Sequence, residues 1–192
     1  MKQKGNTKPA KKPDFWKNVR KGVTVPVELK DRVYNEYYSR DKLYVYCDSS
    51  MNKDKGLMSV ACTYVSNANI IVKQQLVYPN YQVVNKNIFG ELKSIIFALT
   101  NINKYLGHNC KEIQIYSDVK YIDKILNHEI NFKKHRLLKD LKGELSDLYQ
   151  CKVKELNGLD INISYLNKEY RSYNPFSKSS HNAAKKLLLY SN

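Results

Sequence analysis

The sequence predicts an α/β domain: a mixed five-stranded sheet, three strands antiparallel and then two parallel, flanked by helices and preceded by a basic N-terminal extension. Three observations predict it. Three strand-forming runs follow one another between residues 43 and 78, as in an antiparallel meander. A long stretch with a helical repeat of apolar residues then leads to a fourth strand-like run. A fifth run follows a further helical stretch, and strands that follow helices in this way favour right-handed crossovers to parallel neighbours.

The N-terminal part of the chain differs in composition from the rest. Residues 1–13 are rich in lysine and almost free of apolar side chains, so we expect a disordered basic tail. Residues 14–41 form an N-terminal extension in which Pro26 is placed to open a helix. The apolar side of that helix would carry Val27, Leu29, Val33 and Tyr37. Residues 42–192 form the main domain.

The five predicted strands are short runs rich in β-branched and aromatic residues. Two of them, the first and the fourth, end at an aspartate. The second and third are joined by the turn-rich tetrapeptide at 66–69. Their expected ranges are Leu43–Asp48, Leu57–Val65, Ile70–Tyr78, Glu112–Asp118 and Ile161–Leu166.

The predicted helices of the main domain are recognised by apolar residues three and four positions apart. The first spans Asn87–Leu106 and is closed by Gly107. A short helix follows the fourth strand at 119–126, and residues 133–156 form one or two basic amphipathic helices. A polar loop to Ser180 leads to a last helix that starts at His181. The predicted order is therefore three strands, a helix, a strand, helices, a strand and a helix.

The composition is strongly basic, with a formal net charge of +15 in 192 residues. Such a field attracts polyanions, and nucleic acid is the leading expected partner. A merely soluble basic protein, or one that binds acidic lipid or ribosomal RNA, is the alternative. No run approaches the roughly 20 apolar residues that span a bilayer, and the start does not resemble a secretory signal. We therefore expect a cytoplasmic protein, a monomer that does not bind membranes, with its scattered cysteines reduced.

Three carboxylates fall where this strand order would bring them together. Asp48 ends the first strand, Glu91 lies early in the first long helix, and Asp118 ends the fourth strand. Gathered carboxylates repel one another, and a hard divalent cation among them removes that repulsion. Oxygen ligands favour Mg²⁺, with Mn²⁺ as a possible substitute. Two such ions can activate a water and stabilise the leaving oxygen of a phosphodiester. Taken singly, each residue could instead be a turn former or a helix-terminal acid.

The sequence around these acids resembles that of type 1 ribonuclease H. LYVYCDSS resembles the first strand of that family with its aspartate. NIFGEL resembles the stretch in which an asparagine, here Asn87, stands four residues before the metal-binding glutamate. IYSDVKYI resembles the fourth strand and its following turn, and the basic segment at 133–142 lies where bacterial members carry a substrate-binding protrusion. The resemblance covers roughly residues 42–190, with the elements in the same order.

The resemblance implies a Mg²⁺-dependent endonuclease that hydrolyses the RNA strand of RNA–DNA hybrids by two-metal catalysis. It implies that Asp48 bridges two ions, that Glu91 and Asn182 flank them, and that Asp118 holds the ion that activates the water. The implied substrate contacts are Ser49, Asn87, Tyr121, Lys134, Arg136 and Lys139.

The sequence departs from the family pattern at three places. Asn182 stands where the family has a fourth metal-binding aspartate, and Ser49 replaces the usual glycine. The loop after the fifth strand lacks the family's mobile histidine, for which His181 is the nearest substitute and Lys168, Glu169 and Arg171 are further candidates.

These departures keep a second hypothesis open, a hybrid-binding or nucleic-acid-binding module of the same fold with weakened catalysis. Two further hypotheses are a different nuclease of the wider superfamily and a basic structural protein bound to RNA. FWKNVRKG at 15–22 also resembles the start of a small hybrid-binding module, so Trp16 could stack on a base.

Overall fold

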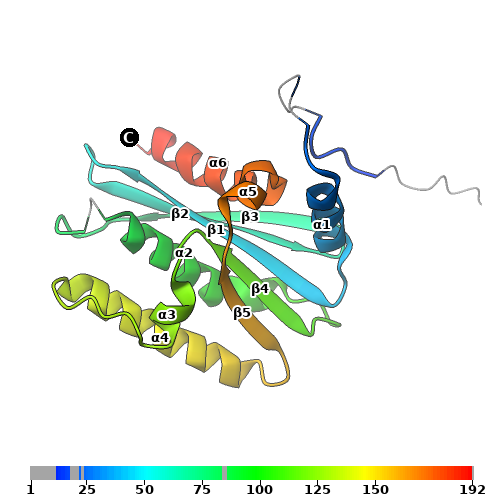
Figure 1. Ribbon diagram of the computed structural model, residues 1–192. Helices are drawn as coiled ribbons and strands as arrows, with labels where there is room; N and C mark the ends of the chain where they lie inside the picture. Colours follow the sequence, from blue (N-terminus) through cyan, green and yellow to red (C-terminus); the bar gives the residue numbers. More distant parts are fainter. Residues whose placement is uncertain (1–11, 18–21, 23, 84–85, 192) are drawn as a thin grey trace, which may run out of the picture.

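A computed structural model of the chain describes residues 12–17, 22, 24–83 and 86–191 (Figure 1). It contains one mixed sheet with the strand order β3-β2-β1-β4-β5. The neighbours β1–β2 and β2–β3 are antiparallel, and β1–β4 and β4–β5 are parallel, which confirms the predicted sheet. The strands are β1 (Lys42–Asn52), β2 (Leu57–Ser66), β3 (Asn69–Val77), β4 (Glu112–Ser117) and β5 (Asp160–Tyr165).

Strand β1 is longer than the sequence predicts. It does not end at Asp48 but continues to Asn52, because its antiparallel pairing with β2 persists to the pair Asn52–Leu57. The parallel pairing of β1 with β4 stops earlier, at the pair Tyr46–Tyr116. Asp48 and Asp118 therefore both lie two residues beyond the last parallel pair, at the same end of the β1–β4 pairing.

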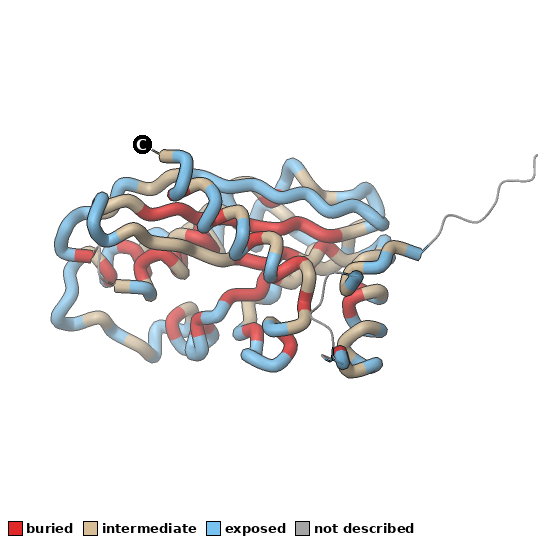
Figure 2. The backbone as a smooth tube through the Cα atoms, turned by 90° about the horizontal axis from the view of Figure 1, so that it is seen from above, coloured by how far each residue is buried: buried red, intermediate tan, exposed pale blue. Residues whose placement is uncertain are grey.

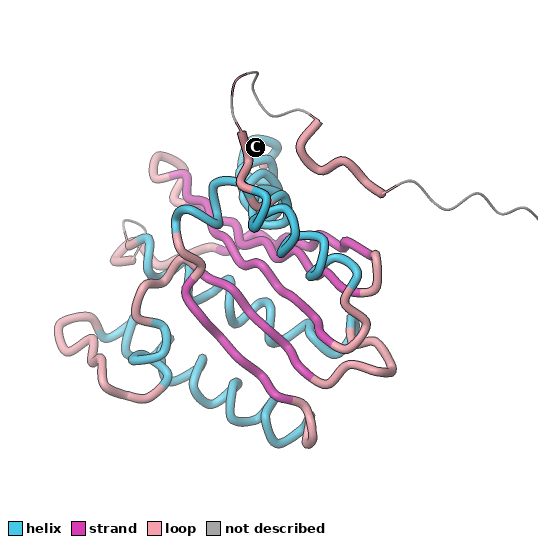
Figure 3. The backbone as a smooth tube through the Cα atoms, turned by 45° about the vertical axis from the view of Figure 1, so that its right-hand side comes forward, coloured by secondary structure: helices cyan, strands magenta, loops and turns pink. Residues whose placement is uncertain are grey.

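The helices cover both faces of the sheet (Figures 1 and 3). One face carries α2 (Asn87–Asn101) and α4 (Arg136–Glu155), which pack against each other, with α3 (Ile122–Leu126) beside β5. A 3₁₀ turn, Ile102–Tyr105, continues α2. The opposite face carries α1 (Val27–Tyr38), α5 (Lys168–Tyr173) and α6 (Pro175–Tyr190).

Two apolar cores lie on the two faces, because successive residues of a strand point to opposite sides. In β1, Val45 and Cys47 belong to the larger core beneath α2 and α4. Tyr46 belongs to a smaller, aromatic core beneath α1 and α6. In Figure 2 many of the buried residues lie in the central strands. The edge strand β3 is largely exposed.

The segment after β5 is helical, whereas the sequence predicts a polar loop to Ser180. Asn167 caps α5 by accepting a hydrogen bond from the backbone N–H of Tyr170. Asn174 caps α6 by accepting from Phe176 and Ser177, and Pro175 occupies the first turn. The last helix therefore begins six residues before the expected start at His181.

The N-terminal extension packs on the main domain. The helix expected after Pro26 is α1, while the expected disordered tail falls mostly on residues 1–11, outside the described residues. Trp16 donates a hydrogen bond from its indole N–H to the Tyr173 carbonyl at 2.9 Å. Phe15 contacts the ring of Phe176 on α6. Trp16 thus packs against the protein and is not presented as a free stacking platform.

Two expectations about the chain's chemistry can be compared with the described residues. The four cysteines are free thiols, and Cys47 and Cys62 face each other across the β1–β2 pair with their sulfurs 3.6 Å apart. None of the described helices combines the length and the apolar character needed to cross a membrane.

Candidate active site

The three predicted carboxylates line one cleft of about 910 Å³ at the end of the parallel ladder. Asp48 comes from β1 and Asp118 follows β4 directly. Glu91 reaches the same cleft from the N-terminal half of α2. The side chains are thus brought together by two neighbouring strands and the helix that crosses them.

The close approach of α2 to β1 depends on Gly90. A Cβ atom at this position would lie 2.6 Å from Ser49 Oγ and 2.9 Å from Ser49 Cβ, closer than such atoms can stand. The approach brings the next residue, Glu91, against β1, where Ser49 Oγ donates a hydrogen bond of 2.6 Å to Glu91 Oε1. Ser49 therefore orients a carboxylate.

Glu91 is held in an environment that disfavours its charge. Its Oε2 atom is buried and receives no hydrogen bond. Burial and the negative charges of the neighbouring Asp118 and Asp48 carboxylates raise the pKa of Glu91 well above its usual range. Since neighbouring ionised carboxylates repel one another, this environment favours a bound proton or cation.

Asp48 and Asp118 are each paired with a basic side chain from the face that carries α5 and α6. Arg171 donates to Asp118 Oδ2 at 2.6 Å. His181 Nδ1 lies 3.2 Å from Asp48 Oδ2. Burial raises the pKa of Asp48 to about 6, since the opposing influence of His181 only partly offsets it and Asp118 adds to it.

The donor set fits a hard divalent cation in part. Three carboxylates face one cleft, and the unpartnered Oε2 of Glu91 is a free oxygen donor of the kind that Mg²⁺ prefers. Across the described ranges, however, no three His, Cys, Asp or Glu side chains stand together as a group that could hold a metal ion. Asp118 and Asp48 are instead turned to Arg171 and His181.

The other predicted site residues divide into two groups. Ser49, Asn87 and Tyr121 line the cleft. Lys134, Arg136 and Lys139 do not; they are exposed at and just before the start of α4, and Arg136 is 3.8 Å from Asp140.

Asn182, expected as the fourth ligand, is exposed and does not line the cleft. The residues of α6 that line the cleft are Ser177, Lys178 and His181.

Several cleft residues were not among the predicted ligands and substrate contacts. The sequence predicts Arg171 and His181 only as substitutes for the missing loop histidine, and its motifs assign no role to Lys53, Lys120 and Lys178, which also line the cleft. The pair Asn174-Pro175 is the sequence signal that could have found Lys178 and His181, because it marks the N-terminus of a helix that contains them.

Comparisons with known proteins find similarity in structure alone. No family model matches the sequence, and neither does any curated protein. The N-terminal ribonuclease H domain of a Mycobacterium tuberculosis protein is 14% identical, with a TM-score of 0.55 over 79% of this chain and 99% of that one. The ribonuclease H1 of Halobacterium salinarum is 15% identical, with a TM-score of 0.50 over 76% and 98%. The LC11 ribonuclease H1 in complex with an RNA/DNA hybrid is 13% identical, with a TM-score of 0.53 over 76% and 99%.

Proposed function

Because the chain has the ribonuclease H fold, and because Asp48, Glu91 and Asp118 line one cleft of it, we propose that it is an endonuclease that hydrolyses the RNA strand of RNA–DNA hybrids. The convergence of these three carboxylates carries the proposal. The sequence identities are too low to transfer an activity, so the activity is inferred from the residues of this chain.

We propose that these three carboxylates hold Mg²⁺, for which Mn²⁺ can substitute. A divalent cation supplies the positive charge that activates a water and stabilises the leaving oxygen of a phosphodiester. Glu91 is the best prepared ligand, because its Oε2 atom is buried without a partner. Asp48 and Asp118 become available when His181 and Arg171 turn away from them. These two basic groups then remain in the cleft as donors for a phosphate.

The protein would bind the proposed substrate mainly through the sugar-phosphate backbone of the nucleic acid. Lys53, Lys120 and Lys178 line the carboxylate cleft, and the chain carries a net charge of +15. Lys134, Arg136 and Lys139 add exposed charge at the start of α4. Proteins recognise duplexes that contain RNA chiefly by shape, phosphates and 2′-hydroxyl groups. The structural similarity to a ribonuclease H1 bound to a hybrid supports this substrate class.

A second candidate function is a hybrid-binding module with little or no turnover. Two observations favour it: Asp118 and Asp48 are paired with basic side chains, and Asn182 is not among the residues that line the cleft. Such a protein would retain affinity for hybrids through its basic surface. It would lack cleavage in both Mg²⁺ and Mn²⁺.

One experiment separates these functions. A labelled hybrid, duplex DNA and duplex RNA are each incubated with the protein in Mg²⁺, in Mn²⁺ and in chelator. We expect cleavage of the hybrid's RNA strand alone, only with a divalent cation, and its loss in Asp48→Asn. Asp147→Asn, an exposed aspartate on α4, is the matched control and should cleave as wild type does. Hybrid retention without cleavage would establish the second function, and cutting of duplex DNA would contradict both.

A further inference from the structure

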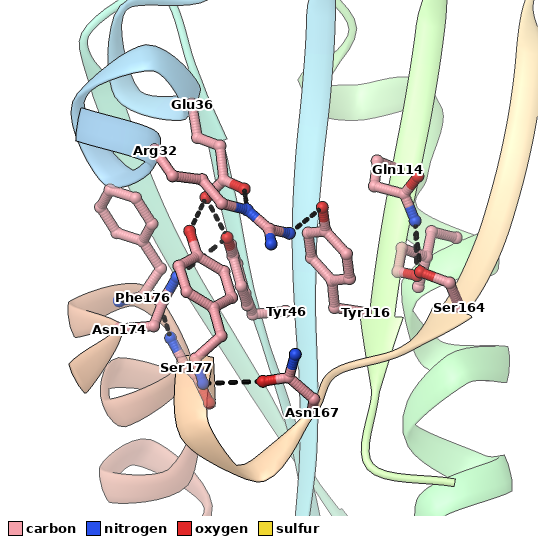
Figure 4. Close-up of polar contacts among 12 residues, drawn as sticks. Arg32, Glu36, Tyr46, Gln114, Tyr116, Ser164, Asn167, Asn174, Phe176 and Ser177 are labelled. Atoms are coloured by element: carbon pink, nitrogen blue, oxygen red, sulfur yellow. Dashed lines mark hydrogen bonds and ion pairs between the residues drawn. The ribbon is translucent and has the colours of Figure 1, made fainter. Parts of the chain in front are cut away.

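Helix α1 places one carboxylate, Glu36, inside the protein on the face that carries α5 and α6 (Figure 4). We propose that Glu36 is a positioning residue that fixes α5 and the first turn of α6, and so sets where Arg171 and His181 stand in the cleft. The expected effect on cleavage rests on the proposed function; the effect on α5 and α6 does not. The N-terminal extension would then be part of the active-site architecture.

Glu36 is buried and is fully provided with hydrogen-bond donors. Its side chain is 3% exposed. Glu36 Oε2 accepts a hydrogen bond from the Tyr170 hydroxyl at 2.7 Å and another from the Tyr46 hydroxyl. Arg32 donates to Glu36 Oε1 at 3.1 Å. A buried carboxylate with three donors from different elements fixes those elements relative to one another, since moving any donor leaves a buried acceptor unsatisfied.

One branch of this network runs to the start of α6. Asn174 is fully buried and donates to the Tyr46 hydroxyl at 3.1 Å. Its side-chain oxygen accepts from the backbone N–H groups of Phe176 and Ser177 at 2.8 and 2.9 Å (Figure 4). The chain of contacts from Glu36 through Tyr46 to Asn174 therefore ends on the N-cap of the helix that carries His181.

The other branch runs to α5. Tyr170 donates to Glu36, and the Arg32 guanidinium lies over the Tyr170 ring, 3.8 Å from its centroid. Arg32 also donates to the Tyr116 hydroxyl on β4 at 2.8 Å. Tyr170 is thus held on two sides, and the next residue is Arg171, which pairs with Asp118. The network thereby contacts α5 and the start of α6, the two helices whose basic groups pair with the cleft aspartates.

The location of the network supports a positioning role. Tyr46 lies two residues before Asp48 in β1, and the two side chains share a face of the strand. Tyr116 lies two residues before Asp118. A shift of Tyr46 or Tyr170 would therefore move the segments that carry Arg171 and His181, while the strand pairing next to Asp48 and Asp118 stays the same.

The test uses Glu36→Gln, with Glu28→Gln on the exposed side of the same helix as the matched control. Hydrogen exchange is followed in the metal-free protein at a temperature where thermal melts show each variant folded. We expect exchange in residues 168–178 to speed up about fivefold or more in Glu36→Gln, with β4 unchanged. If Glu36→Gln does not fold, Tyr170→Phe, which removes one hydroxyl from the network, should show the same effect at smaller size.

A cleavage cycle then distinguishes positioning from general stability. We expect Glu36→Gln to lower kcat several-fold with little change in KM, and to have no further effect in an Arg171→Ala, His181→Ala background, since the groups it positions are gone. Equal losses in both backgrounds, or exchange in residues 168–178 that matches Glu28→Gln, would overturn the proposal. If the wild type cleaves no hybrid, the proposed function fails, and the exchange result alone still decides the positioning role.

Discussion

At the scale of single residues, the cleft stores unfavourable electrostatic energy. Asp48 and Glu91 are carboxylates whose charge is opposed by burial and by neighbouring acids. Such an arrangement lowers the stability of the cation-free protein and favours any cation that relieves it. The stability of the protein without metal therefore reports on the site directly.

The pH dependence of stability follows from the sign of these shifts. The pKa of Asp48 is raised from 3.8 to about 6 in the folded protein. Between these values the folded state binds more protons than the unfolded state, so this group's contribution to stability falls as pH rises and is constant above the window. Glu91 acts in the same direction. We expect metal-free Asp48→Asn to melt at a higher temperature than wild type at pH 7, and the difference to shrink toward pH 4. A lower melting temperature for Asp48→Asn at pH 7 would be inconsistent with this account.

Gly90 permits a second test at the same scale. Gly90→Ala should push α2 away from β1, since the new Cβ would meet Ser49 at 2.6 Å. We expect a loss of about 1–3 kcal/mol in the free energy of unfolding and a large loss of cleavage. Gly143→Ala on α4 is the control, because a Cβ added there would meet no atom within 4 Å. Denaturant titrations measure both; unchanged stability in Gly90→Ala would mean that α2 is not held so closely.

At the scale of elements, the sequence predicted the sheet better than the helices beside the cleft. The strands and α2 carry regular apolar patterns, so the local sequence and the packing of the core favour the same elements. Strand β1 runs past Asp48 through polar residues, because pairing with β2 and not composition extends it. Helices α5 and α6 begin at asparagine caps, a local signal that a polar loop prediction overlooks. The pairing of His181 with Asp48 depends on where α6 crosses β1, which no local pattern contains.

The N-cap of α6, Asn174, can be tested by mutation. Asn174→Ala removes two hydrogen bonds to the first turn of α6 and one to Tyr46. We expect a loss of about 1–2 kcal/mol in the free energy of unfolding. Asn182→Ala, exposed on the same helix, should change neither stability nor cleavage. Loss of cleavage in Asn182→Ala would restore that residue as a ligand and contradict the position described for it.

At the scale of the whole molecule, the net charge of +15 should dominate affinity for nucleic acid. Each phosphate contact contributes about 0.9 to the slope of log affinity against log salt concentration for duplex DNA. Replacing Lys134, Arg136 and Lys139 by alanine should therefore reduce the slope for a hybrid by up to about 3. Lys73→Ala on the exposed strand β3 is the control and should leave it unchanged. An unaltered slope in the triple variant would mean that the start of α4 does not contact the nucleic acid.

Glu91 lies on α2, whereas the two aspartates come from β1 and the end of β4, so its place in the cleft depends on the packing of the whole domain. The most direct measurement is the rate of hybrid cleavage in Mg²⁺ by Glu91→Gln, a nearly isosteric change that removes the negative charge and replaces one ligand oxygen by an amide nitrogen. We expect a folded protein that still binds hybrid and has lost on the order of 100-fold or more in cleavage rate. Cleavage at the wild-type rate by this variant would contradict a cation site built from positions 48, 91 and 118.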